Sequence, residues 1–509
     1  MSRNRLIAGQ AGISYGGFLV GQAVRFGFNL LVARLLGEEA LGVYALAFGV
    51  MQIVETFGVG GYDAAAVRYV NLYTAEGRKA SDAAGFALRS ALFMSLVPAV
   101  LVMLFSGVLS RMLGGGASLD GSASLLVGGT LLQYALISYA LAVPFNVATL
   151  VVGHAIQGHR DLAPKIVATQ ILSPCIMLLL TALLLVAEQP GPALLAPYPA
   201  ASVLSCLWIW RQLRRKTGTG ITEMLRAPAD RRMRSFAFPL LGVSVLSMVS
   251  YWIDILLLGM LGGPFLSGLY QPAARTAGIL RAVLPAFSGI AAPLVAALQA
   301  GERNTETGRL YRLVTRWMVL CVMPATVFLM LLPEPVLLLF GPGFAAGSTA
   351  LALLSAAAFV QAFGGIAGTV LSMAGHGRVT FLNALLALAV QVALSVLLIP
   401  HVGITGAAGA SLGSIVLLTT LRLAEVARVL DIRPFSHSLW KPFAAGAGAA
   451  LTLFFSKPWL LGLAPALTVL AGIGLVMGVY LGLCVLFRLE ADDRELILSI
   501  MPNRRNTPS

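Results

Sequence analysis

The chain contains few charged residues. Asp, Glu, Lys and Arg make up 11% of its 509 residues, whereas about a quarter of a soluble protein is charged. Hydrophobic residues make up 58% of the chain. Apolar runs of about twenty residues recur along its length, and each is long enough to cross a bilayer as a helix. This composition excludes a soluble protein and predicts an all-α polytopic membrane protein, because lipid offers no partner to exposed backbone groups.

Cysteine, metal-binding patterns and nucleotide-binding loops are scarce or missing. The four cysteines all lie inside apolar runs, where a free cysteine behaves as a small hydrophobic residue. The five histidines show no metal-ligand spacing, and there is no GxxxxGK[ST] loop. We therefore expect no disulfide framework, no metal, no cofactor and no nucleotide hydrolysis. The first residues, MSRNRLIAGQAGISYGG, lack the pattern of a cleavable signal, so we expect them to be retained at the start of the first span.

The apolar runs predict about fourteen transmembrane helices. The predicted spans are 10–36, 40–62, 85–110, 122–152, 165–187, 194–210, 236–261, 267–298, 313–332, 346–372, 381–400, 404–427, 442–460 and 464–487. With the N-terminus inside, the cytoplasmic segments and their edges hold all but six of the 35 Lys and Arg residues. The positive-inside rule therefore places both termini in the cytoplasm. This asymmetry accounts for the net charge of +14 without a nucleic-acid partner.

The densest basic cluster lies between the sixth and seventh predicted spans. Its members are Arg211, Arg214, Arg215, Lys216, Arg226, Arg231, Arg232 and Arg234. We interpret this cluster as a topology anchor and as a linker between two halves of the chain. The alternative is a surface that binds anionic lipid heads or a cytoplasmic partner.

One short phrase occurs twice. LLVARLLGEEALGVYALAF, residues 30–48, is echoed by LLLGMLGGPFLSGLYQPAA, residues 256–274. The matching residues are Leu36-Gly37, Gly42 and Tyr44 in the first copy, and Leu261-Gly262, Gly268 and Tyr270 in the second, with one extra residue between the second pair of glycines. A second echo has the same offset of six spans. It pairs Gly158-His159-Arg160 with Gly375-His376-Gly377-Arg378.

The two echoes predict a duplicated half. The predicted domains are an N-terminal six-helix bundle at 1–210, a basic cytoplasmic linker at 211–235, a C-terminal six-helix bundle at 236–430, and a helix pair with a cytoplasmic tail at 431–509. Because six is even, both bundles have the same orientation, and their symmetry axis should lie along the membrane normal. Two such bundles facing each other form a cleft. If the bundles rock, the cleft opens first to one side of the membrane and then to the other, as in a transporter.

The chain also resembles a known family. The stretches ARLLGEEALGVYAL (33–46), YWIDILLLGMLG (251–262), GLYQPAAR (268–275) and GPGFAAG (341–347) are similar to polysaccharide-biosynthesis oligosaccharide flippases of the Wzx type. These flippases belong to one superfamily with lipid II flippases and multidrug MATE exporters. The resemblance extends over nearly the whole chain.

This resemblance implies a secondary transporter and not an enzyme. The implied activity is to flip a polyprenyl-pyrophosphate-linked oligosaccharide or polysaccharide repeat unit from the inner to the outer leaflet by alternating access. The implied location is the bacterial cytoplasmic (inner) membrane, in the synthesis of O-antigen, lipopolysaccharide or exopolysaccharide. The implied partners are the lipid bilayer, the lipid-linked oligosaccharide, and a polysaccharide polymerase with its chain-length regulator.

Five ionisable residues lie deep inside the predicted spans. Each costs about 2.5–3.5 kcal/mol near a helix centre, so those that remain usually face a cavity or a partner. We predict that Arg25, Arg275 and Arg281 bind the pyrophosphate head, because a guanidinium presents paired donors to phosphate oxygens. In the related lipid II flippases, arginines on helices 1, 2 and 8 line the cavity. Arg25 and Arg275 match the first and last of these by helix, whereas helix 2 carries Glu55 here.

The buried carboxylates allow two further interpretations. Glu55 and Asp254 are candidates for H⁺ or Na⁺ coupling, because burial readily shifts the pKa of a carboxylate. Alternatively, Asp254 forms a permanent ion pair with Arg25 or Arg275 that only fixes the packing of the helices.

Six polar residues are candidates for lining the transport path. They are Gln10, Ser14, Gln22, Asn29, Gln52 and Tyr270. Hydrogen bonding between helices explains the first five equally well. For Tyr270, as for Tyr251 and Trp252, we favour an aromatic belt at the membrane interface over the wall of a cavity.

Two other functions fit parts of the sequence. A MATE-like multidrug or small-molecule exporter shares the expected fold, but its cavity should be acidic, and three buried arginines favour an anionic substrate. An integral-membrane glycosyltransferase or polymerase usually needs a large outer loop or paired outer carboxylates. The pair Glu38-Glu39 is present only in a short predicted turn.

Overall fold

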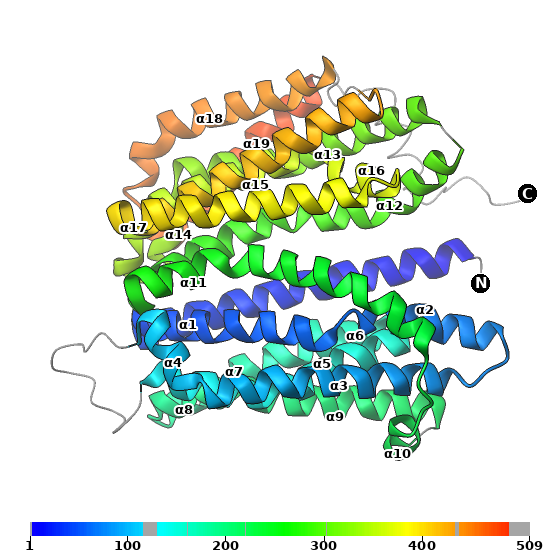
Figure 1. Cartoon of the computed structure of the whole chain (residues 1–509). Helices are drawn as coiled ribbons and strands as arrows, with labels where there is room; N and C mark the ends of the chain where they lie inside the picture. Colours follow the sequence, from blue (N-terminus) through cyan, green and yellow to red (C-terminus); the bar gives the residue numbers. More distant parts are fainter. Residues whose placement is uncertain are drawn as a thin grey trace, which may run out of the picture. The chain divides into compact units, whose positions relative to one another are not determined.

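The computed structural model of the chain describes residues 3–115, 130–159, 161–218, 220–301, 303–432 and 437–487. Within these ranges the regular elements are all helices, which confirms the predicted all-α fold (Figure 1). The chain divides into two compact units. The predicted segment 122–129 and the tail after residue 487 lie outside the described ranges.

The first unit contains residues 1–275, 340–350 and 384–411. Its helices are α1 (Arg3–Val59), α2 (Tyr62–Ala75), α3 (Ala80–Leu104), α4 (Ser106–Ser110), η1 (Arg111–Gly115), α5 (Leu131–Gly158), α6 (Ala163–Ile166), η2 (Val167–Leu172), α7 (Ser173–Val186), α8 (Pro190–Leu195), α9 (Pro197–Thr217), α10 (Ile221–Leu225), most of α11 (Arg231–Arg281) and η3 (Pro342–Gly347). Within this unit α1 packs against α3, α5 and α7, and α5 packs against α9. These contacts bring α1, α5 and α9 together, and the buried charges described below lie on this framework and on α11.

The second unit contains residues 276–339, 351–383 and 412–509. Its helices are α12 (Val283–Ala300), α13 (Asn304–Leu331), α14 (Pro333–Leu338), most of α15 (Ser348–Phe363), α16 (Ala367–Met373), η4 (His437–Leu439), α18 (Trp440–Leu460) and α19 (Pro465–Leu486). The long helix α17 (Gly377–Val429) contributes its middle to the first unit and its two ends to the second. Within the second unit α13 packs against α12, α18 and α19.

Three long helices are interrupted by a glycine with non-helical backbone angles, namely Gly37 in α1, Gly263 in α11 and Gly403 in α17. The chain doubles back at these glycines. In α1 the rings of Phe28 and Tyr44 lie 4.9 Å apart, although sixteen residues of straight helix would separate them by about 24 Å. Each interruption falls between two predicted spans, so the short turns expected there are present. The predicted pairs are 10–36 with 40–62, 236–261 with 267–298, and 381–400 with 404–427.

The backbone angles correct the alignment of the first echo. Gly37 has φ 84° and ψ −177°, and Gly263 has φ 79° and ψ 177°. The turn glycine of the second copy is therefore Gly263 and not Gly262, and no residue is inserted between the glycines. A positive φ of this kind favours glycine. Because Gly262 and Gly263 are adjacent, the sequence pattern did not distinguish between them.

A close backbone contact joins the two copies just after their turns. A Cβ on Gly42 would overlap the carbonyl oxygen of Pro264 and lie 2.9 Å from the Gly268 amide nitrogen. A Cβ on Gly268 would overlap the carbonyl oxygen of Glu38 and lie 2.8 Å from the Gly42 amide nitrogen. In the corrected alignment Glu38 and Pro264 are equivalent positions, so each hairpin makes the same contact with the other. Glycine at both positions lets the two backbones approach this closely.

The second echo does not share one backbone conformation. Gly158 is the last residue of α5, whereas Gly375 follows α16 with φ 88°. Both lie at helix ends, as predicted, but they do not form the same turn. The support for a duplicated half therefore comes from the first echo.

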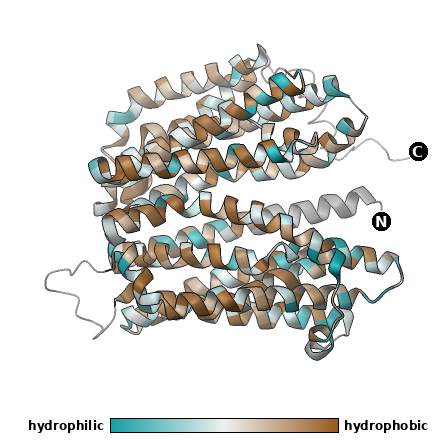
Figure 2. Cartoon of the chain, in the orientation of Figure 1, coloured by the Kyte–Doolittle hydropathy of each residue, from teal (hydrophilic) through white to brown (hydrophobic). Residues whose placement is uncertain are grey.

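The described part of the chain contains nine helical segments that are long and apolar enough to cross a membrane. Three of these nine are segments that contain the turn glycines, so each of the three supplies more than one pass. Figure 2 shows that the helices are largely hydrophobic, with hydrophilic residues gathered near the α2–α3 turn and the start of α11. The chain is therefore a multi-pass membrane protein. The count of fourteen spans and the division at 210, 235 and 430 remain predictions.

The basic linker is an ordered part of the first unit. α10 packs on α3, and Met224 and Ala227 are buried there. The eight basic side chains of the cluster are all exposed, so both interpretations of the cluster stay open.

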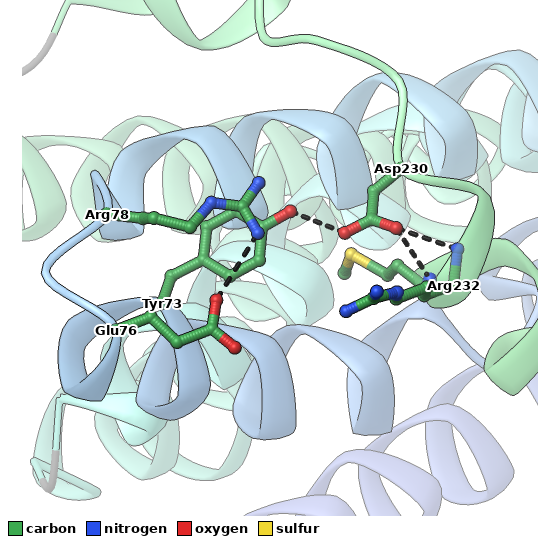
Figure 3. Close-up of polar contacts among 6 residues, drawn as sticks. Tyr73, Glu76, Arg78, Asp230 and Arg232 are labelled. Atoms are coloured by element: carbon green, nitrogen blue, oxygen red, sulfur yellow. Dashed lines mark hydrogen bonds and ion pairs between the residues drawn. The ribbon is translucent and has the colours of Figure 1, made fainter.

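A tyrosine on α2 anchors the end of this linker. The Tyr73 hydroxyl donates to Asp230 Oδ2 at 2.5 Å, and Asp230 Oδ1 accepts from the amides of Arg232 and Met233 at the start of α11 (Figure 3). Burial raises the pKa of the Asp230 carboxyl, but these hydrogen bonds outweigh that effect and hold the pKa below its usual range. The Arg78 guanidinium lies 3.6 Å from the centre of the Tyr73 ring. Asp230 therefore caps α11 and ties it to α2.

Candidate functional site

Arg25, in the first half of α1, is held by polar groups of neighbouring helices. Its Nη1 donates to Gln22 Oε1 at 3.1 Å, and its Nη2 donates to Thr169 O at 3.1 Å and to Gln170 Oε1 at 2.9 Å. Thr169 and Gln170 lie in η2, a π-helical turn, where the wider backbone spacing displaces carbonyl groups from their usual partners. Gly21 permits this approach, because a Cβ there would overlap the carbonyl oxygen of Gln170.

Arg275, in the second half of α11, rests on two aromatic residues. Its guanidinium carbon lies 4.4 Å from the centre of the Trp252 ring, and its Nη1 donates to the Tyr251 hydroxyl at 3.3 Å. Trp252 is only 2% exposed and packs edge-on against Phe48 of α1. Trp252 is therefore not part of an interface belt but supports the arginine from inside the unit, in a cation–π contact.

Arg25 and Arg275 both belong to the first unit. The charge of Arg275 and the hydroxyls of Tyr44 and Tyr251 are among the groups whose fields act on Arg25. Arg25 is twelve residues before its turn glycine and Arg275 is twelve residues after Gly263, so each lies about 18 Å along a helix from an equivalent turn. Neither arginine forms an ion pair with a described residue, which overturns the interpretation that Asp254 is their permanent counter-ion.

Glu55, in the second half of α1, is buried among neutral donors. It is 5% exposed and accepts from the Tyr198 hydroxyl, from Asn146 Nδ2 at 2.7 Å and from Gln52 Nε2 at 3.2 Å. Asn146 also donates to Tyr198 at 2.8 Å. The site therefore satisfies both carboxylate oxygens without a cation from any described residue. Such a group can hold a proton or a small cation.

Asp254, in the first half of α11, has a similar environment. It is 6% exposed and accepts from the Tyr270 hydroxyl at 3.1 Å and from Gln391 Nε2 of α17. Each buried carboxylate thus has one tyrosine hydroxyl and at least one side-chain amide as donors. The likeness in chemistry makes the two sites natural counterparts.

The predicted lining residues are mostly partners of these charges. Gln22 accepts from Arg25, Gln52 donates to Glu55, and Tyr270 donates to Asp254. Asn29 is 4% exposed and donates to the Arg25 carbonyl oxygen at 2.7 Å, while its own Oδ1 is buried and accepts no hydrogen bond from the described part of the chain. The hydrogen bond of Tyr270 joins the two halves of α11, whereas that of Gln52 lies within one helix. A role of these residues in lining the transport path stays a prediction. The side chains of Gln10 and Ser14 lie outside the described residues.

Arg281 belongs to the second unit. Its Nε is buried and has no hydrogen-bond partner among the described residues. Arg25 and Arg275 therefore have hydrogen-bond or cation–π partners among the described residues, whereas the Arg281 Nε has none there.

The sequence pattern missed several residues that define these sites. They are Thr169 and Gln170 beside Arg25, Asn146 and Tyr198 beside Glu55, and Gln391 beside Asp254. Each is a polar residue inside an apolar run, which is the signal that could have marked it. The pairing of each with a charge more than ninety residues away is a property of the folded chain.

The chain matches the family model of polysaccharide biosynthesis proteins over residues 10–299, which is more than half of its length. It belongs to that family. The matched region contains most of α1, both buried carboxylates and all three predicted head-binding arginines. The expected family relationship is thus confirmed.

Comparisons with individual proteins agree with this assignment. A probable flippase, AglR, of Haloferax volcanii is 25% identical over 217 residues, which cover 41% of this chain and 45% of that protein. The chain thus matches less than half the length of that relative. A structure of the lipid II flippase MurJ in an inward closed conformation superposes with a TM-score of 0.71 at 15% identity, covering 96% of this chain and 99% of that one. An inward-facing multidrug resistance MATE transporter of the MOP superfamily has a TM-score of 0.67 at 15% identity, covering 85% and 99%. The fold is therefore that of flippases and exporters of this superfamily.

Proposed function

We propose that this family member is a flippase. It moves a polyprenyl-pyrophosphate-linked oligosaccharide or polysaccharide repeat unit from the inner to the outer leaflet by alternating access, and it catalyses no covalent step. The family and the similar proteins named above support a flippase. The pyrophosphate-linked substrate is inferred from the charges of the site.

The pair Arg25 and Arg275 carries this proposal. Both guanidinium groups lie in the first unit, and their hydrogen-bond and ring partners among the described residues are neutral. Two uncompensated positive charges in a low-dielectric site are costly without an anion. A pyrophosphate head brings negative charge and several acceptor oxygens, which guanidinium groups bind with paired hydrogen bonds. The head passes the arginines while the lipid tail stays in the bilayer.

Glu55 and Asp254 are proposed to couple the cycle to H⁺ or Na⁺. Both are buried and accept hydrogen bonds from neutral donors, a tyrosine hydroxyl and at least one side-chain amide in each case. Loss of that proton or cation would favour a rearrangement of the hydrogen bonds between α1, α5 and α9, or between α11 and α17. A buried carboxylate is suited to such a role.

The cellular setting is proposed from the charge distribution. The concentration of Lys and Arg on one side of the predicted spans supports cytoplasmic termini. We propose the bacterial cytoplasmic membrane as the location and the O-antigen, lipopolysaccharide or exopolysaccharide pathways as the setting. A polysaccharide polymerase and a chain-length regulator are the proposed partners.

The decisive experiment measures lipid-linked oligosaccharide in cells that carry Arg275→Ala or Arg25→Ala, with protein amounts checked by immunoblot. We expect precursor to accumulate on the inner leaflet and surface polysaccharide to fall. Arg211→Ala, which removes an exposed arginine at the end of α9, is the matched control and should behave as wild type. Unchanged precursor pools in both variants, with normal protein amounts, would refute the proposed anion binding.

An exporter of small cationic molecules is the second candidate. The observation that favours it is the pair of buried carboxylates, because a carboxylate can also bind a cationic drug. In that case Glu55→Gln or Asp254→Asn should lower drug resistance while polysaccharide stays normal. Accumulation of precursor in the arginine variants decides against this candidate.

A further inference from the structure

The second unit contains a small cavity at a break between two helices. α15 ends at Phe363 and α16 begins at Ala367, and the backbone between them turns through Gly365 with φ 58°. The lining residues are Leu284, Gln361, Gly364, Gly365, Ala367, Gly368, Ile415, Leu418, Thr419 and Arg422. All of them belong to the second unit, whereas Arg25 and Arg275 belong to the first.

Glycines around the break make room for the Arg422 side chain. A Cβ on Gly368 would lie 3.1–3.2 Å from the Arg422 guanidinium group. The Tyr311 hydroxyl donates to the Gly364 carbonyl oxygen at 2.7 Å and holds the break in place. The arginine therefore lies against a backbone surface without side chains, which is a common feature of sites where a ligand or side chain approaches closely.

Two polar atoms at this cavity have no partner. Arg422 Nε and Gln361 Oε1 are both buried and make no hydrogen bond within the described part of the chain. A buried polar group left unpaired destabilises the fold, and more so when it is charged. An arginine inside a membrane-spanning helix adds to that cost. A ligand that accepts a hydrogen bond from the guanidinium would therefore stabilise this site.

The nearest opposite charge does not neutralise Arg422. Glu425, three residues further along α17, is the carboxylate whose field acts on it. The two side chains form no ion pair, and Glu425 instead accepts from Asn383 Nδ2 at 2.6 Å. Arg281, whose Nε is also buried and has no hydrogen-bond partner in the described ranges, lies three residues before the lining residue Leu284 in the sequence. Arg422 at the cavity thus lacks full compensation by a described carboxylate.

We infer that this cavity is a second binding site for a phosphoryl group. Arg422 Nε donates to a phosphate oxygen. Gln361 either accepts from a protonated phosphate oxygen or, after a half-turn of its amide, donates from its NH₂ group. This inference rests on the proposed function: the phosphoryl group is that of the lipid-linked substrate, bound apart from Arg25 and Arg275, or a free phosphate of the same chemistry.

Binding to the full-length protein tests the site. The protein is purified into nanodiscs of phosphatidylcholine, and three probes are titrated by calorimetry: farnesyl pyrophosphate, inorganic pyrophosphate and farnesol. The measurements use an Arg25→Gln/Arg275→Gln background, which removes the first site. We expect farnesyl pyrophosphate still to bind in this background, and Arg422→Gln to weaken that binding at least about tenfold.

Matched variants separate charge from geometry. Arg428→Gln removes an exposed arginine from the same helix and should leave binding unchanged. Arg422→Lys keeps the charge but loses the fixed fork of donors, so binding should be intermediate. Gln361→Met removes the second polar group at nearly constant volume, and it tests the site should Arg422→Gln fail to fold.

The outcomes are distinct. Equal affinity for inorganic and farnesyl pyrophosphate supports the site with a soluble phosphate as its source, whereas preference for the farnesyl probe supports a lipid head. Equal binding by folded Arg422→Gln and Arg428→Gln proteins overturns the inference, and so does farnesol binding as tightly as farnesyl pyrophosphate. The proposed function is tested separately, because it depends on precursor accumulation in Arg25 and Arg275 variants and not on Arg422.

Discussion

The α1 and α11 hairpins share one backbone plan but carry their charges in opposite order. In α1 an arginine precedes the turn and a carboxylate follows it, whereas in α11 the carboxylate Asp254 comes first and Arg275 second. The two arginines are each twelve residues from an equivalent glycine, and the position eighteen residues after the turn is Glu55 in one hairpin and Arg281 in the other. The two hairpins thus share the turn and the glycine contact, and they differ in the order and type of their buried charges.

The largest expected effect comes from breaking the contact between the hairpins. Gly42→Ala or Gly268→Ala places a Cβ against the backbone of the other hairpin, which cannot move as a side-chain tip can. Overpacking of this kind costs about 1–3 kcal/mol or more, so we expect little folded protein by size-exclusion chromatography. Gly16→Ala, in the same helix and with no atom within 4 Å of the added Cβ, is the control and should accumulate normally. Normal yields of both contact variants would show that the hairpins do not need this approach.

The second prediction compares the two arginines. Arg25 is held by three directional hydrogen bonds, whereas Arg275 rests mainly on an aromatic face. Replacement by Lys should therefore impair Arg25 more than Arg275, because hydrogen bonds of charged groups contribute about 1.5–3 kcal/mol each and a cation–π contact accepts either cation. Flipping measured in proteoliposomes should fall by about tenfold or more for Arg25→Lys. An equal loss at both sites would contradict this difference in how they are held.

The third prediction compares the two carboxylates. Glu55→Gln and Asp254→Asn replace each group by an amide of similar shape that cannot release a proton or bind a cation as a carboxylate does. We expect both variants to flip the substrate more slowly. The variant whose hairpin carries the coupling carboxylate should also lose its dependence on an imposed pH or Na⁺ gradient. If only one variant loses that dependence, the coupling site is assigned to its hairpin. Wild-type flipping rates and wild-type ion dependence in both variants would contradict the proposed coupling role.

The smallest effect is expected at the start of α11, which has an anchor at Asp230. Asp230→Ala removes the cap of α11 and the bond to Tyr73, at a cost of about 1 kcal/mol, and should lower the melting temperature at pH 7. Because the folded pKa of Asp230 lies below its usual range, this contribution is full above the ordinary Asp pKa of about 3.9 and is lost as the pH falls through the folded value. The melting temperatures of the two proteins should therefore converge on acidification. Asp230→Asn keeps the cap and should lose less.

Local sequence features predicted much of the fold and part of the site. Apolar length predicted the helices, and the LLG…G phrase predicted turns at the right places, because a span needs about twenty apolar residues and a tight turn favours glycine. The buried charges Arg25, Glu55, Asp254 and Arg275 stood out because ionisable residues are rare in apolar runs. The pattern chose Gly262 where the turn uses Gly263, and it left open whether Asp254 pairs with an arginine or couples an ion. Both depend on contacts that a linear pattern does not contain.

By itself, the sequence determined that this protein is a multi-pass helical membrane protein with a repeated hairpin, since burial in lipid leaves few alternatives for such apolar runs. The tertiary structure alone decided which group each charge meets. It placed Tyr198 and Asn146 on Glu55, Gln391 on Asp254, and η2 on Arg25. A hydrogen bond depends on distances of about 3 Å between atoms, and only the packing of helices that are distant in the sequence sets those distances.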